Sequence, residues 1–377
     1  MAAAVATVLW LTMLSGTSVG AHSADDACSR FGRVETTGSV VNPGLTEISG
    51  VVASGRHDGV LWTHNDSGGG PEVFALGEDG ADLGAFTVTG ASATDWEDIA
   101  RGPGPDRATS YLYIGDIGDN GLRRDHVTIY RVAEPSARPV SGGTLRGVET
   151  ITLRYPGGPA DAEALLVDPV TGDLLVITKS WVGRSTVLRA PAPSLTSGAR
   201  ITMLDEGTLQ ISPPSGLPAG LPGTAVTGAD ISADGSLILV RTYRQVLAFT
   251  RAEGQTVPDA LTHGHPCGAP QAEEKQGEAV ALTRGEAAYV TISEGLAQAV
   301  HRAAIGPRAD VSTTAAPNTP RPNPTSSGDG RGGGDGGGVP VAALVGAASL
   351  VVVLVAFVAA ARTRRRRTEP TAGGRSR

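Results

Sequence analysis

The sequence predicts an all-β fold, a β-propeller with five blades, followed by one C-terminal transmembrane helix. The 377 residues include 52 Gly and 25 Pro but only 4% aromatic residues, a composition typical of many short strands and tight turns. An acidic residue that opens a short apolar strand recurs five times, roughly every 50 to 70 residues, which is the spacing of propeller blades. A mostly apolar segment, residues 339–361, lies near the C-terminus.

The five units begin at acidic residues, namely Glu47, Glu97, Glu163, Asp230 and Glu278. Each opening strand is followed by a second and a third strand after turns rich in Gly, Asp or Pro. Residues 147–153 and 199–204 are predicted to be outer fourth strands. Residues 212–223 form either a long loop or a degenerate unit, so six blades is the alternative count. A β-sandwich has similar short strands, but it does not explain the recurring acid.

The last unit has no fourth strand of its own, and the strand-like segment 32–41 precedes the first unit. We expect the two to pair, because this closes the ring and removes free strand edges. Cys28 and Cys267, the only cysteines, lie just before this segment and just before the last unit. In an exported chain two cysteines usually form a disulfide. The alternative is a metal site made by Cys267 with His263 and His265, but their spacing matches no established ligand pattern.

The predicted propeller spans residues 28–305. The segments on either side of it indicate export and anchoring. Residues 1–21 contain a short apolar run and a small-residue cleavage site, which predict a signal peptide. The basic region that normally begins such a signal is missing, so an uncleaved anchor is the alternative. Residues 306–338 are rich in Thr and Pro and then in Gly, and they are expected to be a linker.

Residues 339–361 are expected to cross the membrane. At about 1.5 Å per residue they would reach roughly 34 Å as a helix, slightly more than a ~30 Å hydrocarbon core. Residues 362–377 are arginine-rich, and positive charge remains on the cytoplasmic side. We therefore expect a single-pass protein of the cell membrane, with the N-terminal domain outside and residues 362–377 in the cytoplasm.

The formal net charge of -7, despite the arginine-rich C-terminus, indicates an acidic outer domain. Such a domain repels nucleic acid, which is excluded as a partner. It suits metal cations and neutral or basic partners. The expected partners are the membrane, through one helix, and an extracellular protein or a cell-wall ligand.

In a propeller the first strand of each blade lines the central channel, so acids at the heads of these strands converge at one mouth. Such crowded carboxylates need a cation or protons to neutralise them. Oxygen ligands suit Ca²⁺, and Mg²⁺ less well. The predicted ligands are Glu47, Glu97, Glu163, Asp230 and Glu278, with Asp116 and Asp119 as additions. The alternative is that each acid accepts backbone N–H bonds within its own blade, without a metal.

Nucleophilic catalysis has little support, because HExxH and P-loop motifs are absent from the sequence and residues 28–305 contain no GxSxG nucleophile elbow. The catalytic candidates are His64, at the end of a strand, as an acid–base group, and the pair Asp95 and Glu97 as the two carboxylates of a glycosidase. We favour a binding or scaffold module with Ca²⁺ at the channel mouth. A Ca²⁺-dependent hydrolase that uses the same acids is the alternative, and whether the protein is an enzyme stays open.

The strings EISGVVAS, GVLWTHNDSGG and VFAL, and then TDWEDIARGP, YLYIGDIGDN and IYRV, resemble a family of exported, mostly actinobacterial propeller proteins of unassigned function. More loosely they are similar to a group of bacterial propellers that includes phytase-like esterase domains and SdiA-regulated proteins. The resemblance covers about residues 45–300. Similarity to phytase-like members implies bound Ca²⁺ and phosphoester hydrolysis. The chain departs from that pattern because it has few lysines to hold phosphate, and Arg123, Arg124 and Arg241 would replace them only if they faced the channel.

Overall fold

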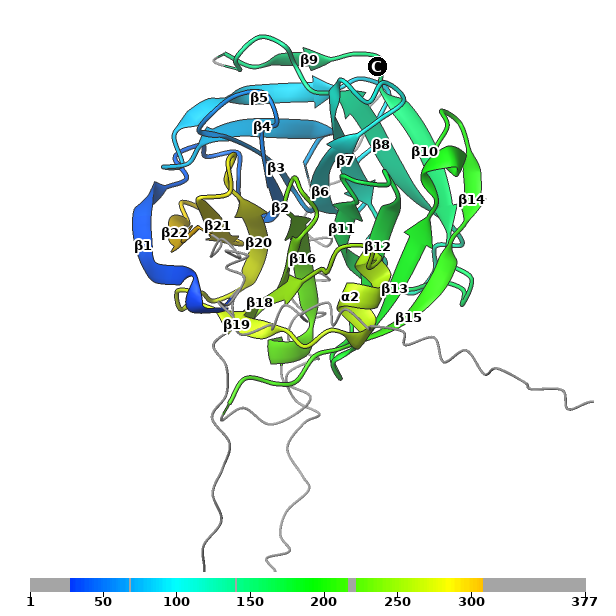
Figure 1. Cartoon of the computed structure of the whole chain (residues 1–377). Coiled ribbons are helices and arrows are strands. Elements are labelled where there is room, and N and C mark those ends of the chain that lie inside the picture. The colour runs from blue at the N-terminus through cyan, green and yellow to red at the C-terminus, as the bar shows by residue number, and fades with distance from the viewer. Residues whose placement is uncertain (1–27, 68, 140, 216–221, 308–377) are drawn as a thin grey trace, which may run out of the picture. The chain divides into compact units, whose positions relative to one another are not determined.

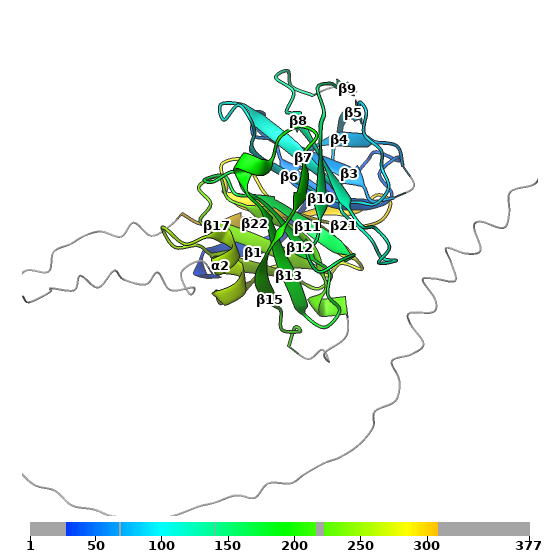
Figure 2. The same cartoon turned by 90° about the vertical axis from the view of Figure 1, so that its right-hand side faces the viewer.

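The computed structural model describes residues 28–67, 69–139, 141–215 and 222–307. Within them, five sheets surround a central axis, each with its first strand innermost (Figure 1). Figure 2 shows the same sheets from the side. The domain is a five-bladed β-propeller, which confirms the predicted fold class and the count of five blades.

The strands of each blade follow one another outward from the axis. Blade 1 contains β2 (Ile48–Ala53), β3 (Val60–Asn65), β4 (Glu72–Gly77), β5 (Asp82–Val88) and β9 (Gly143–Leu145). Blade 2 contains β6 (Trp96–Pro103), β7 (Ser110–Asp116), β8 (Val127–Ala133), β10 (Glu149–Arg154) and β14 (Arg200–Thr202). Blade 3 contains β11 (Ala162–Val167), β12 (Leu174–Thr178), β13 (Arg184–Ala190) and β15 (Leu204–Gln210). Blade 4 contains β16 (Val226–Ile231), β17 (Leu237–Thr242), β18 (Gln245–Thr250) and β19 (Cys267–Ala269). Blade 5 contains β20 (Gly277–Leu282), β21 (Ala288–Ser293), β22 (Ala299–Ile305) and β1 (Phe31–Ser39).

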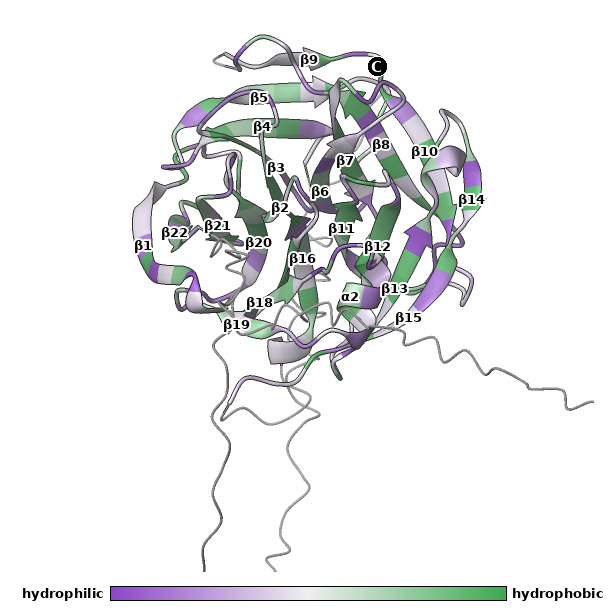
Figure 3. Ribbon diagram, viewed as in Figure 1, coloured by the Kyte–Doolittle hydropathy of each residue, from purple (hydrophilic) through white to green (hydrophobic). Residues whose placement is uncertain are grey.

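Packing between neighbouring blades forms the core. The first strands β2, β11, β16 and β20 are buried at every residue, because each lies between the two adjacent blades. Their sequences are accordingly apolar on both faces rather than alternating. Five apolar clusters fill the five interfaces between blades, and Figure 3 shows hydrophobic residues concentrated along the inner strands. Each blade therefore depends on both neighbours for its stability.

One helix, α2 (Val257–His263), lies between β18 and β19 in the sequence. The Thr256 side chain accepts a hydrogen bond from Asp259 N and caps its first turn. Its buried residues, which include Ala260 and Leu261, join the apolar cluster between blades 3 and 4. Two short 3₁₀ turns occur at Ala192–Ser194 and Pro222–Thr224.

The outer strands differ in part from the prediction. Residues 199–204 were expected to complete the third unit, but β14 pairs in parallel with β10 of blade 2, and β15 completes blade 3. Likewise β9 pairs in parallel with β5 of blade 1. Outer strands are largely exposed, so their hydrophobic pattern does not specify the strand with which they pair. Their position is set by backbone hydrogen bonds to the edge strand of a blade.

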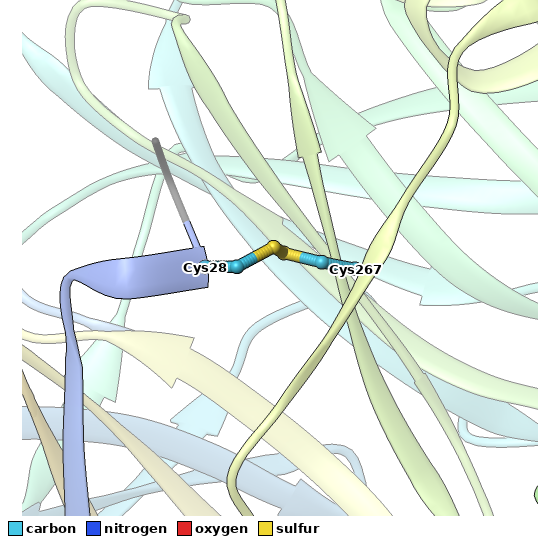
Figure 4. Close-up of a disulfide and its surroundings, with 2 residues drawn as sticks. All are labelled: Cys28 and Cys267. Atoms are coloured by element: carbon cyan, nitrogen blue, oxygen red, sulfur yellow. A yellow bond between two sulfur atoms is a disulfide. The ribbon is translucent and has the colours of Figure 1, made fainter. Parts of the chain in front are cut away.

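The N-terminal strand closes the ring. β1 pairs antiparallel with β22, as expected for residues 32–41. A disulfide joins Cys28 to Cys267 across 239 residues of sequence (Figure 4), which confirms the predicted pair and excludes Cys267 as a metal ligand. At the C-terminal end of β22, close to Cys28, Gly306 N donates to Arg30 O at 2.7 Å.

The predicted signal peptide, most of the linker, the membrane span 339–361 and the tail 362–377 lie outside the described residues. Within the described residues, none of the helices has the length and apolar character that crossing a membrane requires.

Candidate functional site: an acidic mouth on the propeller axis

One face of the propeller is formed by the starts of the first strands and by the loops that follow the second strands. Backbone hydrogen bonds of 2.8–3.1 Å join these loops to the strand starts. They run from Asp66 N to Glu47 O, Trp96 N to Asp66 O, Gly118 N to Asp95 O, Lys179 N to Asp161 O, and Glu294 N to Gln276 O. We call this face the mouth.

Five carboxyl groups from blades 1 to 3 gather in the mouth. Carboxylate oxygens of Asp66, Asp95 and Glu97 all lie within 4.8 Å of one another, and so do those of Glu97, Asp161 and Glu163. Glu97 belongs to both groups. We call these five residues the acidic cluster. Only two of them, Glu97 and Glu163, were predicted as metal ligands, and Asp95 was predicted only as a catalytic candidate.

A β-bulge near the start of each first strand positions the glutamates. The pairing register shifts at Glu97, Glu163 and Glu278, which are therefore structurally equivalent. In the other two blades the bulge contains Ser49 or Thr227 instead. These hydroxyls donate to backbone carbonyls of the next blade, Ser49 Oγ to Glu97 O at 2.5 Å and Thr227 Oγ1 to Gly277 O at 2.8 Å. The bulge positions of the five first strands therefore carry three acidic and two hydroxyl side chains.

The structure does not bring Glu47 and Asp230 to the positions that the sequence repeat suggested. Glu47 directly precedes β2 at the edge of the mouth and is half-buried. Asp230 lies near the far end of β16, three residues beyond the bulge at Thr227. Its carboxylate accepts hydrogen bonds from Ile231 N at 2.8 Å and Leu282 N at 2.7 Å. The five acids therefore do not form one ring.

Asp116 and Asp119 hold the loop after β7 in place. Asp116 Oδ1 forms an ion pair with Arg124 Nη1 at 2.8 Å. Asp119 Oδ2 accepts from the backbone N–H groups of Arg123 and Arg124 at 2.7 and 2.8 Å. Its own N–H donates to Asp161 Oδ1 at 2.8 Å, so the loop is tied directly to the acidic cluster.

Burial and mutual repulsion hold protons on the cluster. Burial, and then the charges of Asp95 and Glu163, raise the pKa of Asp66 to about 8. Burial likewise raises the pKa of Glu163 to about 7, although Lys179 acts in the opposite direction. The pKa of Glu97 is well above its usual value for the same reasons, burial first and then Glu163. Without added positive charge, these carboxyls cannot all ionise at neutral pH.

Lys179 neutralises one side of the cluster. Its ammonium forms an ion pair with Glu163, and both side chains are buried. The Lys179 Nζ atom also lies 5.4 Å from the centre of the Trp181 ring and 5.2 Å from that of Tyr243, which stack on each other. Burial disfavours the ammonium, but Glu163 more than offsets this and raises the pKa of Lys179. Lys179 is therefore a fixed positive charge.

His64 lies in a closed pocket. Its side chain is fully buried, with Nδ1 3.1 Å from Asn65 O and its ring edge-on to Trp96. Burial lowers its pKa to about 4, so the imidazole is neutral. The structure thus places this catalytic candidate out of contact with solvent.

The group of Asp66, Asp95 and Glu97 fits a divalent cation. Within the described part of the chain, these three residues form no ion pair, whereas Glu163 already has Lys179. Asp66 Oδ1 is buried and has no hydrogen-bond partner there. A Cβ atom added at Gly118 would lie 2.2 Å from Glu97 Oε1, so a larger residue there would displace the carboxylate from its position. The donors are all oxygen atoms, which suit Ca²⁺ or Mg²⁺.

No family model matches the chain, and no curated protein matches it either. Among solved structures, a crystal structure of glucose dehydrogenase aligns with a TM-score of 0.40 and 10% identity, covering 71% of this chain and 98% of that chain. A second glucose dehydrogenase has a TM-score of 0.39 at 10% identity, over 71% and 98% of the two chains. Raptor of Chaetomium thermophilum aligns at 0.32 and 13% identity, over 71% of this chain and 21% of its own. Similarities with TM-scores this low carry no argument about activity.

The residues that the sequence did not reveal are Asp66, Asp161, Lys179, Trp181 and Tyr243. Asp66 lies within the string GVLWTHNDSGG, but nothing there marks it as a ligand, and the two acids come near Glu97 only when neighbouring blades pack. Lys179 did carry a signal, because it is one of two lysines in a chain that otherwise uses arginine. A lysine retained in that background points to a position where a compact ammonium is required.

Proposed function

We propose that the protein is a binding module whose mouth holds Ca²⁺. The observation that carries this proposal is the asymmetry of the acidic cluster. Glu97 is shared by two groups of carboxylates, one neutralised by Lys179 and the other without an ion pair among the described residues. Protons or a cation must neutralise the second group, and a divalent cation does so while also satisfying Asp66 Oδ1.

Ca²⁺ is favoured over Mg²⁺ because it tolerates irregular carboxylate geometry, whereas Mg²⁺ requires a near-ideal octahedron. Asp66, Asp95 and Glu97 would be its ligands. The ion would supply positive charge at the axis, where it would fix the loop after β3 to the start of β6. The role that follows is the presentation of a rigid binding face.

We further propose that this module is anchored in the cell membrane with its propeller outside. This location rests on the sequence of residues 339–361 and on the arginines that follow them. A binding role suits such a location, because an exposed propeller face is available to an extracellular protein or a cell-wall ligand.

The test measures the thermal unfolding of the full-length chain with excess Ca²⁺, with Mg²⁺ and with EDTA. We expect Ca²⁺ at about 100 times its Kd to raise the Tm by roughly 5–10 °C. Glu97→Gln should abolish this shift, whereas Asp106→Asn, at an exposed acid in the turn between β6 and β7, should retain it. Equal Tm values in Ca²⁺ and EDTA would refute the cation site.

Hydrolysis is a second candidate, favoured by one observation. Asp66 and Glu163 have pKa values raised to about 8 and about 7, so they can exchange protons near neutral pH, as a general acid requires. Arg124 and Arg241, which would have to hold a phosphate, are instead paired with Asp116 and Glu274. The samples used for unfolding are assayed with p-nitrophenyl phosphate. Ca²⁺-dependent turnover lost in Glu97→Gln would establish a phosphoesterase, and its absence would leave the binding role.

A further inference from the structure

Large apolar side chains are exposed around the acidic cluster. The described part of the chain exposes seven such residues, and four of them lie in loops of the mouth. They are Leu122 (59% exposed), Trp181 (49%), Val182 (72%) and Leu296 (59%). These loops follow β7, β12 and β21. Isolated exposed apolar residues are ordinary, but their concentration on the loops of one face marks an interaction surface. We call these four residues the rim.

The rim is held rigidly. Leu122 has a φ of 50°, a left-handed conformation that costs free energy for any residue other than glycine. The loop keeps this conformation because Asp119 accepts hydrogen bonds from the two backbone N–H groups that follow Leu122. Trp181 stacks on Tyr243 with ring centres 5.8 Å apart. Exposed apolar side chains on a fixed backbone lose little conformational entropy on binding.

The surface inside the rim is acidic. Glu278 adds a further buried carboxylate to the mouth, and its Oε2 atom has no hydrogen-bond partner in the described residues. The charges of Glu163 and Lys179 both act on it. The face therefore combines an apolar outer zone with an acidic centre. A partner that complements it carries positive charge between apolar groups.

We propose that the mouth docks a protein segment that presents a lysine or arginine flanked by apolar side chains. The basic group would approach the acidic cluster, and its apolar neighbours would pack on the rim. A polypeptide suits this arrangement, because the rim residues belong to three different blades, 2, 3 and 5, and a peptide can present one basic and several apolar side chains to them at once. Anionic lipid would be repelled by the carboxylates. The inference rests on the binding role proposed above, but it does not require the cation.

The test is a selection of peptides from a random heptapeptide library displayed on phage, with the immobilised full-length chain as target. The rim variant combines Leu122→Ser, Val182→Ser and Leu296→Ser, and it leaves Trp181 unchanged because that ring contacts Lys179. The control variant combines Val170→Ser and Leu204→Ser, at residues 55% and 46% exposed outside the mouth loops. The strongest peptide is synthesised together with a form in which glutamine replaces its basic residue, and fluorescence anisotropy gives each Kd.

We expect the selected peptides to contain a lysine or arginine next to apolar residues. The Kd should rise by about tenfold or more for the rim variant, and again when glutamine replaces the basic residue. The control variant should bind as the wild type does. Selected peptides without a basic residue, or equal affinity for the rim variant, would overturn the proposal. Rim-dependent sedimentation with phosphatidylglycerol vesicles would also overturn it, in favour of a membrane surface.

The Ca²⁺-induced shift in Tm is measured on the same variants, which separates the two proposals. The rim variant should keep the shift, because its substitutions lie outside the acidic cluster. If the wild type showed no shift but still bound the peptide through the rim, the cation site would fail and the docking surface would stand.

Discussion

Glu97 connects the two halves of the acidic cluster, and its position follows from local structure. It occupies the bulge at the start of β6, and the Ser49 hydroxyl of blade 1 donates to its backbone carbonyl. The sequence predicted this residue because an acid at the head of an apolar strand is a local pattern. Asp66 and Asp161 were not predictable, because they lie in loops and approach Glu97 only when neighbouring blades pack against each other.

At the scale of single groups, pH should act in opposite ways on the cation-free and Ca²⁺-loaded proteins. The pKa of Asp66 in the folded state, about 8, is above its unfolded value of about 4. Between these values the folded state binds more protons, so this stabilising contribution is full below about pH 4 and is lost as the pH rises through about 8. In EDTA, the Tm of the wild type relative to Asp66→Asn should fall between about pH 6 and pH 8.5.

Ca²⁺ must displace the same protons, so its affinity should increase over that pH interval. Isothermal titration calorimetry in two buffers of different ionisation enthalpy measures both the affinity and the protons released. An affinity independent of pH, with no proton release, would show that the raised pKa values of the cluster are not linked to cation binding.

At the scale of elements, a buried aspartate joins the inner strands to one another. Asp98 Oδ1 accepts from Ile99 N at 2.9 Å, and Asp98 Oδ2 accepts from Leu165 N at 2.8 Å and Ala229 N at 3.3 Å. It therefore connects blades 2, 3 and 4. Asp230 repeats part of this arrangement between blades 4 and 5. Asp230, the acid of the fourth unit, therefore bonds to backbone N–H groups of the inner strands and does not lie in the mouth. The order of residues along the sequence does not distinguish these two positions.

Asp98→Ala should leave these backbone N–H groups unsatisfied in the interior. We expect the free energy of unfolding to decrease by about 3 kcal/mol, since each buried donor that loses its acceptor carries its full desolvation cost. Asp125→Ala, at an exposed acid of the loop after β7, is the matched control and should change stability by less than about 0.5 kcal/mol. Urea denaturation followed by tryptophan fluorescence measures both, and equal midpoints for the two variants would contradict the role of Asp98.

The elements differed in how well the sequence predicted them. First strands such as β11 are apolar apart from the acid near their start and are bounded by turns, so their position was clear. β14 and β9 are three-residue strands that pair in parallel with the outer edges of other blades. Their residues are mostly exposed or half-buried, so no periodicity specifies the strand with which they pair.

At the scale of the whole molecule, closure of the ring depends on residues far apart in the sequence. β1 provides the outermost strand of the last blade, and the disulfide joins Cys28, just before that strand, to Cys267 in β19 of blade 4. The closure was predictable from two features of the sequence. The last unit has no fourth strand of its own, and the strand-like segment 32–41 belongs to none of the five units. The number of blades followed from the same repeat.

Replacing Cys28 and Cys267 with serine should lower the free energy of unfolding by about 4 kcal/mol, because the unfolded chain loses a constraint across 239 residues. Guanidinium denaturation with and without a reducing agent measures the change. The reductant should destabilise the wild type to the level of the variant and leave the variant itself unchanged. A wild type that is unaffected by complete reduction would show that β1 alone closes the ring.

The pairing of β1 with β22 also places the two ends of the described domain next to each other. Ile305 N donates to Ala287 O in the turn between β20 and β21, at the end of the blade opposite the mouth, and Gly306 and Arg30 are hydrogen-bonded to each other there. Both ends of the described domain therefore leave through the same side, away from the acidic cluster.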